Sequence, residues 1–148
     1  MKKYTIILLL LGLTSMMDAN AGHRGHHPGQ ACQYLKIIIK NDTPFHCYMI
    51  KRTLKMGDIY ETASFKIPSG TENTAFELSE YNGQIHMTLT YECNEGRTIT
   101  FSSTKNACAK SGTITGKKLS TQNMDATFSI TPGSYWAGTP GIIHWTFY

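Results

Sequence analysis

The sequence predicts an all-β fold, a single antiparallel β-sandwich of about eight short strands crosslinked by disulfides. Short segments in which apolar and polar residues alternate recur along the chain, and turn residues separate these segments. No stretch combines a helix cap with a helical period. The chain also contains four cysteines, an even set that is typical of a disulfide-stabilised exported domain.

Residues 1–21 have the pattern of a cleavable signal peptide of bacterial style. A positive start precedes the apolar run 5–13, which is too short to span a bilayer. Ala19-Asn20-Ala21 places small residues where signal peptidase requires them, so we expect cleavage before Gly22. No second long apolar run follows. We therefore expect a secreted or periplasmic protein with no transmembrane segment in the mature chain.

Residues 22–31 form a His- and Gly-rich leader that precedes the predicted sandwich domain, residues 32–148. Cleavage would place the free amine of Gly22 beside the imidazole of His23, and the imidazoles of His26 and His27 follow closely. Such nitrogen donors suit Cu(II) or Ni(II). The candidate metal ligands are Gly22, His23, His26 and His27. The competing interpretation is a flexible polar leader whose histidines have no role.

The charge of the chain argues against a nucleic-acid partner. The formal net charge is +4 for the whole sequence, and it falls to +3 when Lys2, Lys3 and Asp18 leave with the signal peptide. Nucleic-acid binding normally needs a clustered basic face, and the basic residues here are scattered.

The predicted strands follow from the alternation of side chains. In residues 84–92 every second residue, from Ile85 to Tyr91, is apolar, as expected of a strand with one face in a core and the other in water. Segment 104–123 is rich in Ser, Thr, Lys and Gly and gives no clear strand. The expected strands are 35–40, 45–51, 59–67, 74–80, 84–92, 97–103, 126–130 and 142–148.

Turn residues predict how neighbouring strands connect. Asn82-Gly83 suits a two-residue hairpin, because both residues tolerate a positive φ, and 94–96 suits a three-residue hairpin. Residues 74–103 are therefore expected to form a three-stranded meander. Residues 41–44 are expected to turn the first pair of strands into a hairpin.

This layout restricts the disulfide pairings. If 41–44 turns a hairpin, Cys32 lies about 20 Å from Cys47, well beyond the roughly 7 Å between Cα atoms that a disulfide allows. Cys93 and Cys108 are separated in the same way, because the strand that follows the 94–96 turn carries the chain away from Cys93, so this pairing is disfavoured too. We expect Cys47–Cys93, whose members share faces with apolar neighbours, and Cys32–Cys108. A four-cysteine zinc site is disfavoured because no paired knuckle spacing occurs.

The C-terminal segment is dense in aromatic residues. Ile143, Trp145 and Phe147 fall on one strand face and are expected in the core. Tyr135 and Trp136 lie in a loop bounded by Gly and Pro, so they are the candidate binding residues for a surface ligand. The alternative is that Trp136 plugs the end of the sandwich.

No motif identifies a reaction. The sequence has no nucleophile elbow, and the cysteines are expected to be oxidised. The candidate acid–base residues are three histidines and four glutamates in the predicted strands and turns, and no spacing brings two of them together. They are His46, His86, His144, Glu77, Glu80, Glu92 and Glu95.

Two short patterns carry a family resemblance. They are Ile37-x-Ile39-x-Asn41-x-Thr43 and the later Gly83 … Tyr91 … Ile99-x-Phe101. In these, segment 35–103 resembles the aegerolysin group of small β-sandwich proteins that bind membrane lipids. The signal peptide, the four cysteines and the His-rich leader depart from that group's pattern. The resemblance implies a β-sandwich and lipid binding, and it transfers no individual binding residue.

The sequence therefore favours a secreted, non-enzymatic binding or effector protein that acts at a cell or envelope surface. Its ligand is a lipid, a glycan or a protein. The first alternative is a periplasmic or extracellular Cu(II)- or Ni(II)-binding protein that uses the N-terminal histidines. The second is a small secreted hydrolase whose catalytic residues the sequence does not identify.

Overall fold

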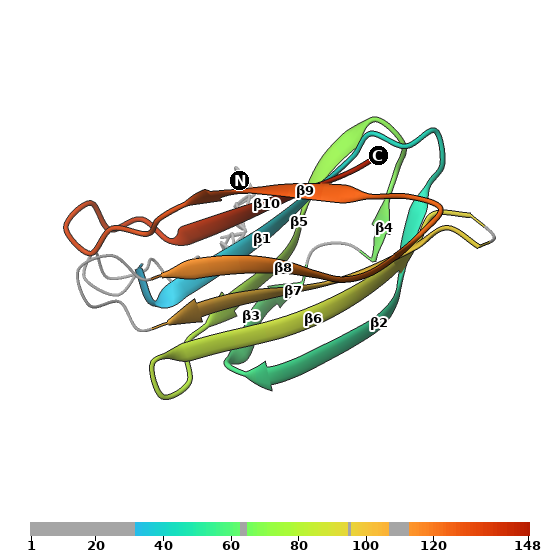
Figure 1. Ribbon diagram of the computed structural model, residues 1–148. Coiled ribbons are helices and arrows are strands. Elements are labelled where there is room, and N and C mark those ends of the chain that lie inside the picture. The colour runs from blue at the N-terminus through green and yellow to red at the C-terminus, as the bar shows by residue number, and fades with distance from the viewer. Residues whose placement is uncertain (1–31, 63–64, 95, 107–112) are drawn as a thin grey trace, which may run out of the picture.

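The computed structural model describes residues 32–148, except 63–64, 95 and 107–112. These residues form two five-stranded β-sheets that pack face to face (Figure 1). The predicted β-sandwich is therefore confirmed. The strands are β1 Tyr34–Asn41, β2 Cys47–Met56, β3 Asp58–Thr62, β4 Lys66–Ile67, β5 Thr71–Ser79, β6 Gln84–Glu92, β7 Thr98–Asn106, β8 Ile114–Gln122, β9 Ala126–Thr131 and β10 Gly141–Phe147.

The two sheets differ in strand order and in the direction of one strand pairing. Sheet A has the order β3-β5-β1-β10-β9, and sheet B has the order β4-β2-β6-β7-β8. Every pairing is antiparallel except that of β1 with β10, which runs parallel from Leu35–Gly141 to Asn41–Phe147. The central strand of sheet A therefore pairs with a strand from the other end of the domain's sequence.

The core lies between the sheets and is aromatic at its centre. The predicted inward faces of 84–92 and of 142–148 are both buried. The ring of Trp145 in sheet A lies 4.4 Å from that of Phe101 in sheet B, and its indole N–H donates to Ser103 Oγ at 3.0 Å. This bond satisfies the one polar atom of the buried indole, so Trp145 costs little to bury.

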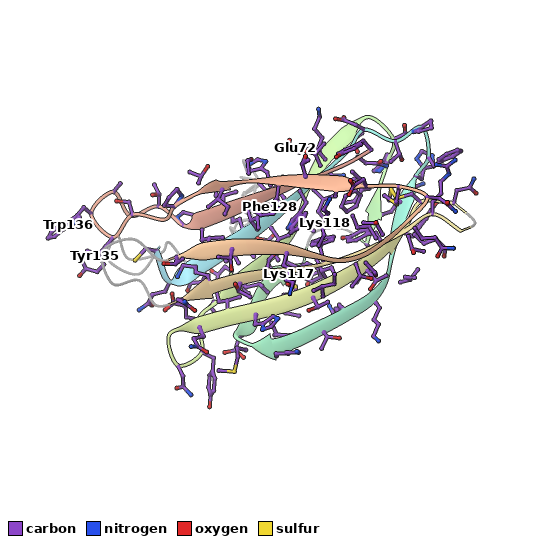
Figure 2. All side chains as sticks on the ribbon, viewed as in Figure 1. Glu72, Lys117, Lys118, Phe128, Tyr135 and Trp136 are labelled. Atoms are coloured by element: carbon purple, nitrogen blue, oxygen red, sulfur yellow. A yellow bond between two sulfur atoms is a disulfide. The ribbon has the colours of Figure 1, made fainter. Side chains whose placement is uncertain are left out.

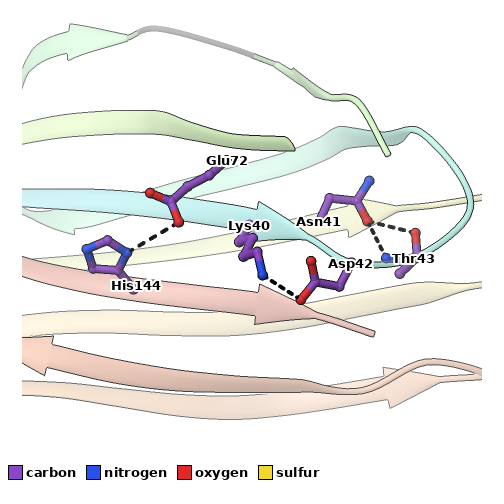
Figure 3. Close-up of polar contacts among 6 residues, drawn as sticks. All are labelled: Lys40, Asn41, Asp42, Thr43, Glu72 and His144. Atoms are coloured by element: carbon purple, nitrogen blue, oxygen red, sulfur yellow. Dashed lines mark hydrogen bonds and ion pairs between the residues drawn. The ribbon is translucent and has the colours of Figure 1, made fainter. Parts of the chain in front are cut away.

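The predicted hairpin at 41–44 is wrong. The edges of β1 are taken by β5 and β10, so the chain crosses from sheet A to sheet B to begin β2. The side chain of Asn41, fully buried, holds this crossing. Its amide donates to the carbonyls of Phe45 and Ile67, at 2.7 and 3.0 Å, and its oxygen accepts from Thr43 (Figure 3).

The predicted meander over 74–103 is wrong in one strand. The Asn82-Gly83 turn forms as expected, with φ of 51° and 74°, and Tyr81 and Gln84 pair across it. The two strands on either side of this turn do not pair along their length, because β5 belongs to sheet A and β6 belongs to sheet B. The 94–96 hairpin does join neighbouring strands, β6 and β7.

Two further segments differ from the prediction. The expected strand 59–67 is two strands that belong to different sheets, β3 and β4. Segment 104–123 contains the end of β7 and all of β8, which lies at the edge of sheet B. The alternation in β8 was hidden because most of its side chains are exposed on both faces.

The Cys47–Cys93 disulfide is confirmed. It joins β2 to the residue after β6, and these strands are neighbours in sheet B. The pairing was therefore right although the hairpin assumed in its derivation does not form. Cys32 is buried, and its expected partner Cys108 lies outside the described residues, so that second pairing stays a prediction.

The sandwich has two distinct ends. The disulfide end carries Cys47–Cys93, the crossing 41–46 and the turn 123–125. The tip end carries the 81–84 turn and the loop between β9 and β10. Beneath the tip end, the fully buried ammonium of Lys105 on β7 pairs with the carboxylate of Glu80, which follows β5, and so links the two sheets.

Within residues 32–148, gaps aside, no helix is long and apolar enough to cross a membrane.

Candidate functional site

The loop between β9 and β10 projects beyond the body of the sandwich, and the two candidate binding residues lie at its end (Figure 2). Trp136 is 90% exposed and Tyr135 is 47% exposed. The alternative in which Trp136 plugs the sandwich is therefore wrong. We call residues 134–139 the aromatic tip.

Backbone hydrogen bonds fix the shape of the aromatic tip. Ser134 and Thr139 pair in both directions, at 3.0 and 3.1 Å, and the Ser134 hydroxyl accepts from the Ala137 N–H at 3.1 Å. The base of the loop is narrow, because a Cβ on Gly133 would lie 2.7 Å from the backbone nitrogen of Gly141. The exposed rings therefore stand on a closed hairpin.

The part of the hairpin next to the tip contains no charged side chain. No Asp, Glu, Lys, Arg or His occurs between Asp125 and His144, a stretch that covers β9, the tip and the start of β10. The rings of Tyr135 and Trp136 meet edge to face at 5.6 Å. Among the described residues, no cation stacks on either ring. This neutrality can be read in the sequence, and it marks the hairpin as suited to a medium that rejects charge.

The aromatic residues at the disulfide end, the partly buried Phe45 and the exposed Tyr48, lie in a different setting. Arg97 lies over the ring of Phe45 at 5.1 Å, and Lys66 lies over that of Tyr48 at 5.5 Å. Both rings line a shallow hollow of about 370 Å³, together with His46, Glu92 and Asn94. These cations already occupy the aromatic faces, so the rings offer less bare apolar surface to a ligand.

The acid–base candidates are dispersed. His144 Nδ1 lies 3.9 Å from Glu72 Oε2 on sheet A (Figure 3), while Glu77 and Glu80 each pair with a lysine. His46 accepts a hydrogen bond from the Ser69 backbone. These contacts are therefore to lysines, to a carboxylate or to a backbone amide.

The predicted metal ligands Gly22, His23, His26 and His27 lie outside the described residues, so the Cu(II) or Ni(II) site stays a prediction. Across the part of the chain that is described, no group of three or more His, Cys, Asp or Glu side chains is placed to hold a metal ion.

Comparisons with known proteins define the fold. No protein-family model matches the sequence, and no curated protein matches it either. Solved structures do match. The lipid-binding protein Nakanori is similar with a TM-score of 0.56 and 10% identity, over 77% of this chain and 70% of that one. IP-1A from Alcaligenes faecalis gives 0.51 and 11%, over 80% and 93%. At such identities the likeness establishes a shared β-sandwich fold.

Proposed function

We propose that the protein binds the surface of lipid membranes and that the aromatic tip makes the contact. The observation that carries this proposal is the setting of Trp136, almost fully exposed at the end of a neutral, hydrogen-bonded hairpin. Trp and Tyr rings gather at membrane interfaces because an apolar body and a polar edge suit the boundary between acyl chains and water.

The energy of this contact is modest. Moving the indole of Trp136 from water into the interface contributes about 2 kcal/mol, which is roughly a thirtyfold change in affinity. Binding through the tip alone is therefore weak and reversible. The likeness in fold to a lipid-binding protein and the resemblance of 35–103 to the aegerolysins support a lipid ligand.

We propose further that the protein acts in a secreted or periplasmic location. The signal-peptide pattern of residues 1–21 and the Cys47–Cys93 disulfide support this location. Mass spectrometry of the exported chain tests it. A mature N-terminus at Gly22 is the expected result, and an intact N-terminus would contradict the proposal.

Cosedimentation with phosphatidylcholine vesicles tests the membrane contact. We expect Trp136→Ala to lower the bound fraction, with a partition coefficient reduced about thirtyfold. The control is Tyr48→Ala, because Tyr48 is another exposed aromatic residue (49%) and lies at the disulfide end, and we expect this change to leave the bound fraction almost unaltered. Equal binding by Trp136→Ala and the unmodified protein would refute the role of the tip.

Tryptophan emission gives an independent readout. The chain has two tryptophans, and Trp145 is buried while Trp136 is exposed, so the difference spectrum between the unmodified protein and Trp136→Ala reports Trp136. On addition of vesicles we expect this spectrum to shift to shorter wavelength and to become protected from iodide. An unchanged spectrum in the presence of bound vesicles would assign the contact to another surface.

A further inference from the structure

The outer face of sheet B carries a groove that the proposed membrane contact does not use. It runs across β2, β6 and β7 to β8 and has a volume of about 310 Å³, and six of its seven lining residues are lysines or threonines. The lining residues are Lys51, Thr53, Lys55, Thr88, Thr90, Thr100 and Leu119.

The two lysines of the groove lack anionic partners in the described structure. Lys36 and Lys40 of β1, which have the same four-residue spacing on sheet A, are each paired with a carboxylate, and Figure 3 shows the Lys40–Asp42 pair. Lys51 and Lys55 form no ion pair among the described residues. The groove therefore presents two uncompensated positive charges, which suit an anionic ligand.

The floor of the groove supplies hydroxyls that both donate and accept. Thr90 Oγ1 and Thr100 Oγ1 lie 3.0 Å apart on neighbouring strands, which leaves each hydroxyl capacity for a further bond. Burial lowers the pKa of His86 on β6, and the positive charge of Lys55 lowers it further, which is the local field expected beside uncompensated cations. The exposed Leu119 adds an apolar rim.

We propose that this groove binds an anionic glycan, with Lys51 and Lys55 facing sulfate or carboxylate groups and the threonines facing sugar hydroxyls. A sugar chain offers both groups along its length, and its C–H faces suit the rim at Leu119. The proposal goes beyond the membrane contact of the aromatic tip and uses a separate surface.

Distance favours a glycan over a phospholipid headgroup, a choice that rests on the proposed docking through the tip end. Lys51 pairs in register with Thr90, which is six residues along β6 from Gln84 at the tip end. At about 3.4 Å per residue Lys51 lies roughly 20 Å from that end, and Lys55, beside the Met56–His86 pair, lies roughly 7–10 Å from it. The headgroup layer of one leaflet is about 5–8 Å thick, so a single headgroup does not reach along the groove to Lys51, whereas a glycan that stands on the membrane spans both lysines.

Calorimetric titration with dextran sulfate, beside neutral dextran, tests the proposal on the chain that begins at Gly22. The test variant is Lys51→Gln/Lys55→Gln, and the control is Lys40→Gln/Lys118→Gln, which makes the same charge change at exposed lysines outside the groove. We expect dextran sulfate to bind and dextran to bind far more weakly. We expect the test variant to lose about fivefold to tenfold in affinity and the control to change little.

A second variant addresses the hydroxyls. Thr90→Val/Thr100→Val keeps the shape and the strand preference of both residues and removes the paired hydroxyls. We expect it to weaken dextran sulfate binding about threefold while the thermal unfolding midpoint stays close to that of the unmodified protein. Affinity equal to that of the unmodified protein would overturn the role of the threonines in the groove.

Other outcomes separate this proposal from the membrane contact. Equal loss in the two lysine variants would show a general charge effect and overturn the groove. Binding to phosphatidylglycerol vesicles that depends on Lys51 and Lys55, without binding to dextran sulfate, would assign the groove to lipid headgroups and overturn the glycan. Trp136→Ala is expected to bind dextran sulfate normally. If it does not, the sugar contacts the tip instead of the groove.

Discussion

The disulfide end and the tip end of the sandwich both display aromatic side chains, and they treat them in opposite ways. At the disulfide end, Phe45 and Tyr48 lie beneath a guanidinium and an ammonium. At the tip end, Tyr135 and Trp136 stand clear of any cation in the described structure. The comparison teaches that aromatic density alone does not mark a docking surface. What lies over the ring decides whether its apolar face is available.

The largest expected loss of stability follows from removing the disulfide at the disulfide end. Replacing both cysteines, Cys47→Ala/Cys93→Ala, frees a loop with a sequence separation of 46 residues. We expect a loss of about 4 kcal/mol in the free energy of unfolding, as the chain-entropy description gives for such a loop. Urea denaturation followed by circular dichroism measures it. By contrast, Trp136→Ala at the tip end is expected to stay within about 0.5 kcal/mol. Comparable losses at both ends would remove the distinction between them.

The second effect tests the interior of the tip end. Lys105→Met leaves the nearly buried carboxylate of Glu80 without its cation, so we expect a loss of about 3 kcal/mol. The double variant Lys105→Met/Glu80→Leu is expected to recover most of that loss, because two apolar side chains then pack where two charges lay. Denaturation of all three proteins completes the cycle. A double variant no more stable than the single would show that the carboxylate is not the source of the penalty.

The third effect concerns the crossing at the disulfide end. Asn41→Ala removes hydrogen bonds to the carbonyls of Phe45 and Ile67 and to the N–H of Thr43. Because these groups stay largely out of water, we expect a loss of about 2 kcal/mol. Asn106→Ala, an exposed amide at the tip end, is the control and is expected to change little. Equal thermal shifts for the two variants would contradict the role of Asn41.

The smallest effect has the opposite sign. The buried hydroxyl of Tyr91 has no hydrogen-bond partner among the described residues, so Tyr91→Phe is expected to stabilise the protein, by up to about 1 kcal/mol. Burial raises the pKa of this phenol, so the folded state keeps its proton when the unfolded state loses it. The stability of the unmodified protein should therefore fall above about pH 10, and this component should be absent in Tyr91→Phe. Denaturation at neutral and alkaline pH measures both, and destabilisation by the variant would reveal a hidden partner.

The sequence predicted where individual strands lie better than it predicted which strands pair with each other. Residues 84–92 were predicted with the observed bounds, because alternating burial is written into adjacent residues. Sheet membership depends on distant partners, so the turns at 41–44 and 82–83 gave no sign that each connects different sheets. Strand β8 was missed for a related reason, since an edge strand exposed on both sides has no buried face to reveal it.

The candidate sites divide in the same way. Tyr135 and Trp136 were proposed as binding residues from their Gly- and Pro-bounded loop, and the sequence left open whether Trp136 is exposed or plugs the sandwich, because that depends on how the loop folds. The groove of sheet B was not predicted, because it needs β2, β6 and β7 placed side by side. Its signal in the sequence is the alternation of threonines, as in Thr88 and Thr90, opposite a lysine-rich strand.

The parallel pairing of β1 with β10 sets the order of events during folding. Leu35 pairs with Gly141 and Asn41 pairs with Phe147, so the first strand of the domain waits for a partner that is synthesised much later. Until then the core lacks Ile143, Trp145 and Phe147, and one edge of β1 stays open. Because contacts between such distant segments form slowly, a nascent chain remains open through most of its synthesis and closes once β10 is available.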